Sequence, residues 1–154
     1  MAYQALASRP PRPLAPALVV EKGPEPGSSV GAYVLNSLLG KGGMGEVYRA
    51  LDTRLDRNVA IKFVCPEQWM DGLAAERLAN EARIASALNH PGIVAVYDIG
   101  RFRGRPFIVM EYVEGQSLAA KLLGGPMKVR DALRIGWQIA DALAAAHAAG
   151  VVHR

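Results

Sequence analysis

The sequence predicts an α+β fold in which an antiparallel sheet comes first and helices follow. Residues 58–64 and 107–110 are short apolar runs rich in β-branched and aromatic side chains, which favour strands. Residues 129–149 instead repeat their apolar side chains at helical spacing, and Gly150 follows as a C-cap signal. At 154 residues and 51% hydrophobic, the chain can bury the core of one domain.

The N-terminal residues differ in composition from the rest of the chain. Residues 1–30 hold six of the ten prolines and show neither helical nor strand periodicity. We therefore expect them to form a flexible, proline-rich tail. They contain no apolar run long enough for a signal peptide or a membrane span.

Four glycines lie within residues 40–45. Glycine lets a backbone approach a ligand closely, and glycine clusters present N–H groups to phosphates in several motifs. The P-loop is excluded because Glu46 follows Gly45 where that motif needs Lys and Ser or Thr. The dinucleotide motif fits by spacing but must open a helix, whereas residues 47–51 favour a strand. Val47 completes a third pattern, G-x-G-x-x-G-x-V.

A single lysine lies inside the apolar run that follows. Residues 59–62 read V-A-I-K, and strand alternation places Lys62 on the same side as Ala60 and Val64. A surface lysine at a strand edge is the alternative interpretation. The position of Lys62 shortly after the glycine cluster favours a functional role.

Residues 68–88 have helical spacing. Leu78, Glu81, Ala85 and Leu88 share one stripe, so Glu81 is expected to face inward with apolar side chains. An inward carboxylate without a partner would be costly, so we expect it to pair with a cation. An ordinary surface pair with Arg77 is the alternative.

These motifs occur in one order, with a hairpin at residues 103–105, the strand at 107–110, and a terminal His153-Arg154. From about residue 31 to 154 the chain resembles the N-terminal part of a bacterial eukaryotic-like serine/threonine protein kinase. The resemblance implies a kinase-like N-terminal lobe at 31–110, with a five-stranded antiparallel sheet and an αC helix. A hinge at 111–117 and the first C-terminal-lobe helices, αD and αE, at 118–154 would follow.

The resemblance also implies an ATP-binding site. Lys62 and Glu81 would be its catalytic ion pair, Val47 and Ala60 would enclose the adenine, and Met110 would be the gatekeeper before the hinge. The complete set of implied ATP-binding residues is Gly40, Lys41, Gly42, Gly43, Met44, Gly45, Val47, Ala60, Lys62, Met110, Glu111 and Val113.

The implied cofactors are ATP and Mg²⁺, with the catalytic aspartate and the metal ligands expected beyond Arg154, so no metal ligand is assigned. We therefore expect little phosphoryl transfer from these residues alone. We also expect the helix at 129–149 to expose its apolar stripe, because the helices that cover it in the family would lie further on. A non-catalytic, pseudokinase-like fragment that binds nucleotide or a partner is the alternative, although Lys62, Glu81 and the loop glycines are intact.

Charge and cysteine content limit the partners. The net charge is +4 and the pI is about 9.5, but the basic residues are scattered, so we expect no nucleic acid as a partner. The expected partners are ATP and protein substrates, with a kinase dimer through the N-terminal lobe as a further option. The single cysteine, Cys65, suits the reducing cytoplasm, and a later membrane helix is common in bacterial relatives.

Overall fold

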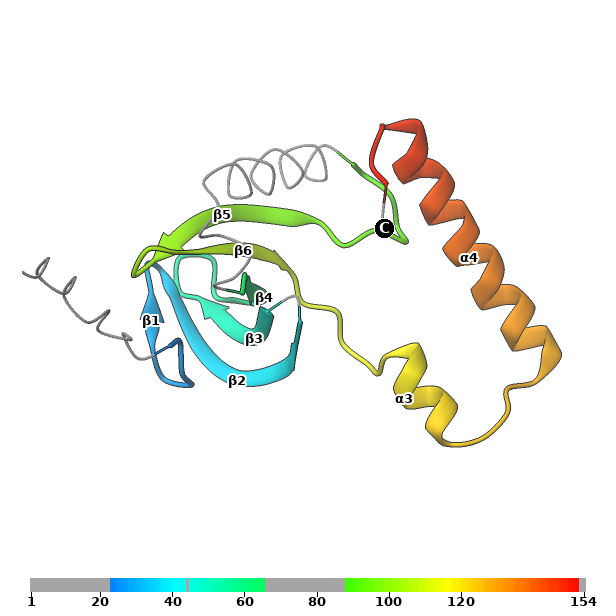
Figure 1. Ribbon diagram of the computed structural model, residues 1–154, viewed down its shortest axis with the longest axis horizontal. Helices are drawn as coiled ribbons and strands as arrows, with labels where there is room; N and C mark the ends of the chain where they lie inside the picture. Colours follow the sequence, from blue (N-terminus) through cyan, green and yellow to red (C-terminus); the bar gives the residue numbers. More distant parts are fainter. Residues whose placement is uncertain (1–22, 44, 66–87, 153–154) are drawn as a thin grey trace, which may run out of the picture.

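The described part of the chain begins with one antiparallel sheet. The computed structural model describes residues 23–43, 45–65 and 88–152. The sheet has the order β1-β2-β3-β4-β6-β5, and every neighbouring pair is antiparallel (Figure 1). Its strands are β1 (Ser29–Val30), β2 (Tyr33–Gly42), β3 (Gly45–Asp52), β4 (Arg57–Phe63), β5 (Val96–Phe102) and β6 (Arg105–Glu111).

The sheet curls strongly, and its core lies inside the curl. β2 and β5 are far apart in the strand order, yet the Tyr33 hydroxyl of β2 donates to Asp98 Oδ2 of β5 at 3.0 Å. Phe63 lies at the centre, with ring contacts to Tyr48, Phe102 and Phe107. The buried core cluster comprises Val30, Tyr33, Leu35, Tyr48, Ala50, Val59, Ile61, Phe63, Phe107 and Val109.

Short turns set the register of the hairpins. Gly42 pairs with Gly45, so only residues 43 and 44 connect β2 to β3. Arg103 and Gly104 connect β5 to β6 with φ values of 49° and 79°. Two consecutive left-handed residues match the twist of the flanking strands, which explains why a glycine lies in this turn. The hairpin expected at residues 103–105 is confirmed.

The sheet has six strands rather than the five expected, because β1 adds a short one. β1 lies at the end of the segment expected to be a flexible tail, and the residues just before it also contact the sheet. Gly27 N–H donates to the Leu35 carbonyl at 2.7 Å, and the Tyr48 hydroxyl donates to the Pro24 carbonyl at 2.7 Å. Val30 is buried in the core. Residues 23–30 are therefore attached to the sheet. The high proline content of this segment did not predict these contacts.

Two helices follow the sheet. α3 (Leu118–Leu123) begins at Ser117, whose Oγ accepts from the Ala120 N–H at 3.1 Å. α4 (Val129–Ala148) matches the helix predicted from spacing. Gly150 has φ 78° and donates to the His147 carbonyl, which confirms its role in ending the helix. Among the described residues, no helix is long and apolar enough to cross a membrane.

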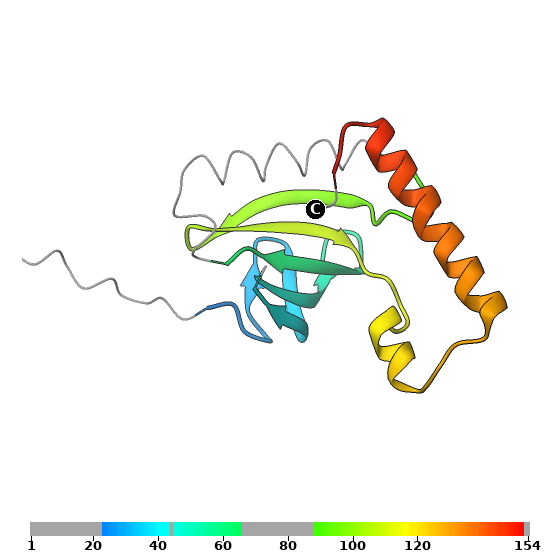
Figure 2. The same ribbon diagram turned by 45° about the vertical axis from the view of Figure 1, so that its right-hand side comes forward.

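α3 and α4 lie beside the sheet and do not cover it (Figures 1 and 2). The segment after β6 leads into α3, and the far end of α4 returns toward the residues before β5. There His90 Nε2 lies 3.1 Å from Asp141 Oδ2 of α4, and His90 Nδ1 accepts from the Gly92 N–H. The helix expected at 68–88, with Glu81, lies outside the described residues except for Leu88.

Candidate functional site

Strand register places four of the predicted site residues on one face of the sheet. Cross-strand partners share a face, and Lys62 of β4 pairs with Val47 of β3 and Ile108 of β6. Ala60, two residues earlier on β4, pairs with Met110. Val47, Ala60, Lys62 and Met110 therefore form one continuous surface.

The alternate residues of the same strands form the hydrophobic core. Val59, Ile61 and Phe63 are fully buried in the core cluster, as strand alternation predicted. Ala60 is only 6% exposed yet does not belong to that cluster. The sheet thus separates an inner apolar face from an outer face that carries Lys62.

The glycine hairpin lies at the end of this outer face, and its glycines have two different roles. Gly45 has φ 122°, and a Cβ there would clash with the Phe63 carbonyl oxygen. Glycine is therefore required at position 45 for the backbone of β3 to approach β4. At Gly40, Gly42 and Gly43 an added Cβ would meet no atom of the described residues within 4 Å. Those three positions leave open space beside the backbone.

Open space beside exposed glycine backbone is what an anionic group needs in order to approach N–H donors closely. The residues after Gly45 form strand β3, not a helix, so the dinucleotide-binding alternative is wrong. Together with Lys62 on the same face, the hairpin offers N–H groups and one cation to a polyanion.

The side chain of Lys41 lies on the other face of the sheet. Lys41 pairs across the hairpin with Glu46, which in turn pairs with the core residue Phe63. Lys41 Nζ is 2.8 Å from Glu46 Oε1, and Arg105 Nη1 is 3.0 Å from Glu46 Oε2. The hydrogen bond from Lys41, and then the one from Arg105, hold the pKa of Glu46 below its usual range, against the opposing effect of burial.

β6 ends at Glu111, and the segment that leads to α3 is anchored there. The Glu111 N–H donates to the Ala95 carbonyl at 2.9 Å, and its carboxylate accepts from the Ala95 N–H at 3.3 Å. The next residue, Tyr112, lies under the Arg49 guanidinium at 5.3 Å, and Val113 is 62% exposed. The segment from 112 to 117 therefore starts from a fixed point beside Met110.

The structure brings together most of the predicted site, while Met44 and Glu81 lie outside the described residues. Sequence analysis missed Glu46 and Arg105, which are 59 positions apart in the chain. Arg105 lies close to Arg101 and Arg103 in the sequence, but nothing in that pattern identifies a carboxylate partner. Within the described ranges, no group of three His, Cys, Asp or Glu side chains could hold a metal ion.

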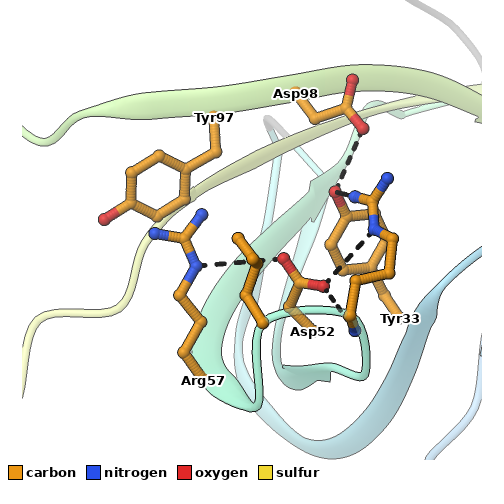
Figure 3. Close-up of a pocket in the computed structure, with 7 residues that line it drawn as sticks. Tyr33, Asp52, Arg57, Tyr97 and Asp98 are labelled. Atoms are coloured by element: carbon orange, nitrogen blue, oxygen red, sulfur yellow. Dashed lines mark hydrogen bonds and ion pairs between the residues drawn. The ribbon is translucent and has the colours of Figure 1, made fainter.

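A cavity of about 400 Å³ lies at the opposite end of β3 and β4 from the glycine hairpin. Figure 3 shows Arg57 and Tyr97 on one side of it and Tyr33 and Asp98 on the other, with Asp52 between them. The Arg57 guanidinium lies 3.9 Å from the Tyr97 ring centroid, and Asp52 is only 2% exposed. Arg54 and Leu55 complete the lining. The lining therefore contains two positively charged residues, Arg54 and Arg57, and two negatively charged residues, Asp52 and Asp98.

Comparison with known proteins identifies relatives that match most of the chain. The family model for the protein kinase domain matches residues 33–154. Serine/threonine-protein kinase PknD of Mycobacterium tuberculosis is 46% identical over 132 residues, which cover 85% of this chain and 20% of PknD. PrkC of Bacillus subtilis is 43% identical over 125 residues, covering 80% of this chain and 19% of PrkC. The chain thus spans about a fifth of the length of these relatives.

Solved structures show the same fold. The kinase domain of M. tuberculosis PknI superposes with a TM-score of 0.76 at 30% identity, covering 86% of this chain and 54% of that domain. The curled sheet, the connecting segment and the two helices thus match about half of a solved kinase domain.

Proposed function

Because the chain belongs to the protein kinase domain family, we propose that it supplies the ATP-binding half of a serine/threonine protein kinase. One observation carries this proposal. Lys62 lies on the same sheet face as Val47, next to a hairpin whose glycines at positions 40, 42 and 43 leave open space. That face also carries Ala60 and Met110, which provide apolar contact area.

Each residue has a distinct role in binding the nucleotide. The N–H groups of the glycine hairpin would cover the phosphates, and the Lys62 ammonium would neutralise the α- and β-phosphates. Val47 and Ala60 would contact one side of the adenine, whose edge would meet the backbone at Glu111 and Val113. Glu81, outside the described residues, would hold the Lys62 ammonium in place.

The site residues fit the organic part of the cofactor and its phosphates. Mg²⁺ would neutralise charge on the β- and γ-phosphates. None of the residues assigned to the phosphate side is a carboxylate, so no Mg²⁺ ligand is assigned among them. Phosphoryl transfer to Ser or Thr of a protein substrate is therefore proposed for a longer chain that includes the catalytic loop.

Replacement of Lys62 by Met tests the proposal. We expect Lys62→Met to weaken ATP binding about tenfold or more, because a charge-assisted contact to phosphate is lost. Binding of adenosine, which lacks phosphates, should change little. Lys121→Met is the matched control, since it removes an exposed lysine that lies on α3 and not on the sheet. Isothermal titration calorimetry with both ligands measures the difference.

Equal weakening of ATP and adenosine would contradict the role of Lys62. Competition by NAD as strong as that by ATP would contradict a kinase site altogether. In a longer chain that phosphorylates a protein substrate, Lys62→Met should abolish transfer. Unchanged transfer would overturn the assignment.

We further propose that the sheet lobe forms a two-fold dimer through the cavity at Asp52. Leu55, in its lining, is 62% exposed between β3 and β4, beside side chains of both charge signs. An isologous interface must be complementary to itself, and a surface with arginines and aspartates around an apolar residue meets that requirement.

Disulfide cross-linking tests the dimer. Cys65→Ser removes the single native thiol, and Leu55→Cys then places one thiol at the proposed axis. We expect a covalent dimer on mild oxidation. Leu39→Cys, at a 47% exposed leucine elsewhere on the sheet, is the control and should remain monomeric. Equal cross-linking at both positions would contradict a specific interface.

The cytoplasm is the location proposed for this ATP-binding half. ATP is abundant there, and a free cysteine such as Cys65 suits a reducing compartment.

A further inference from the structure

Arg105, the first residue of β6, joins three strands at the glycine-hairpin end of the sheet. Its side chain is only 15% exposed. Nε donates to the Val64 carbonyl at 2.7 Å, and Nη1 donates to Glu46 Oε2 at 3.0 Å. The guanidinium carbon lies 5.5 Å from the Phe63 ring centroid. One side chain therefore contacts β3, the end of β4 and the residue that follows β4.

Glu46 is the partner that connects Arg105 to the hairpin. It directly follows Gly45 in β3 and also binds Lys41 of β2 at 2.8 Å. Its side chain is 16% exposed, so water competes with these two cations only in part. Both strands of the glycine hairpin are thus tied to Arg105 through one carboxylate.

The other two contacts of Arg105 reach the strand that carries Lys62. Phe63 is adjacent to Lys62, and Val64 follows it. Gly45 approaches the Phe63 carbonyl so closely that no Cβ fits between them. Cys65 Sγ lies 3.7 Å from the Gly42 carbonyl, which is a further contact between the hairpin and the end of β4. Arg105 therefore braces the two elements of the phosphate site from the face opposite Lys62.

We propose that Arg105 is a positioning residue for ATP, which acts through Glu46 to hold the glycine hairpin at a fixed distance from Lys62. This inference rests on the proposed function. Hairpin N–H groups and the Lys62 ammonium must converge on the same phosphates, so a small displacement of the hairpin weakens both contacts. Arginine suits this role because its rigid, planar guanidinium holds Nε–H and Nη1–H at fixed positions toward two acceptors, whereas the lysine ammonium is a single charge on a flexible stem.

Three variants and one control test the inference. Arg105→Gln removes the cation, Arg105→Lys retains the charge without the fork, and Glu46→Gln removes the carboxylate with little change in shape. Arg101→Gln is the matched control, because it removes an exposed arginine from the neighbouring strand β5. Hydrogen–deuterium exchange measures opening of residues 40–47, and calorimetry measures the dissociation constants of ATP and adenosine.

In Arg105→Gln we expect faster exchange of the hairpin amides and a rise of about three- to tenfold in the ATP dissociation constant. The adenosine constant should stay within about twofold, because adenosine has no phosphate for the hairpin to hold. Glu46→Gln should show the same pattern, and Arg105→Lys should restore part of the ATP affinity. The Arg101→Gln control should change neither readout.

Unchanged hairpin exchange in both Arg105→Gln and Glu46→Gln would overturn the inference. So would an equal rise of the ATP and adenosine constants, since that would indicate general loosening of the sheet. If the unmodified chain binds neither ligand, the proposed function fails for this chain. The exchange measurement still decides whether Arg105 holds the hairpin. If Arg105→Gln does not fold, the milder Glu46→Gln supplies the same comparison.

Discussion

The sheet and the helices of this chain differ in how completely they bury their apolar side chains. In the sheet, Val59, Ile61, Phe63 and Val109 are fully buried. In α4, Val129, Leu133 and Trp137 are 74%, 69% and 68% exposed, and neither helix has a buried residue. The sheet contains its own hydrophobic core, whereas α4 presents an apolar stripe that no described residue covers. The expected exposure of that stripe is confirmed.

The comparison predicts that core substitutions in the sheet have the largest effect on stability. Phe63→Ala should lower the free energy of unfolding by about 3–5 kcal/mol, because a fully buried aromatic ring leaves a cavity. Leu133→Ala on α4 should change it by less than about 0.5 kcal/mol, since the side chain is already largely in water. Urea denaturation measures both. Equal effects would show that the helices belong to the same cooperative core.

The glycine hairpin offers a sharper comparison within the sheet. Gly45→Ala should destabilise the chain by at least about 2 kcal/mol, because its Cβ would meet the Phe63 carbonyl at a left-handed φ. Gly42→Ala should change stability by less than about 1 kcal/mol, since open space surrounds that position. It should nevertheless weaken ATP binding. Thermal melts of the two variants, with ATP titrations of Gly42→Ala, test this difference. A stable Gly45→Ala would contradict the close approach of β3 and β4.

Local patterns allowed much of this architecture to be predicted from the sequence. The α4 boundaries follow from apolar spacing and Gly150, and the faces of β4 follow from strand alternation around Lys62. The hairpin at Arg103 and Gly104 follows from turn chemistry. These features depend on interactions between residues that are close together in the sequence, so the local sequence pattern is enough to predict them.

The sequence did not predict the features that depend on contacts between residues far apart in the chain. β1 has two residues and exists because β2 pairs with it. The curl of the sheet is closed by Tyr33 and Asp98, 65 positions apart. Side-chain orientation also mattered at Lys41, which lies in the glycine pattern but turns to Glu46 on the opposite face. Only the register of three strands reveals that orientation.

The exposed stripe of α4 should control self-association more than stability. Leu133→Gln combined with Trp137→Gln should reduce association of the chain, because it removes two large apolar side chains from water contact. The free energy of unfolding should change by less than about 0.5 kcal/mol per substitution. Sedimentation velocity at several concentrations measures the association. Arg134→Gln on the same helix is the control, and a monodisperse unmodified chain would contradict the prediction.

The Glu46 ion pairs should make the stability of the chain depend on pH. Hydrogen bonds from Lys41 and Arg105 lower the folded-state pKa of Glu46 below its ordinary value of 4.5. The stabilisation is therefore complete above about pH 4.5 and is lost as the pH falls through the lower folded-state pKa. The stability difference between the unmodified chain and Glu46→Gln, expected to be about 1 kcal/mol, should shrink over that range. Asp131→Asn, which removes an exposed carboxylate on α4, is the control for general acid effects. A difference that stays constant from pH 7 to pH 3 would show that the charge of Glu46 does not stabilise the fold, and the hairpin would then be held by the approach of Gly45 to Phe63.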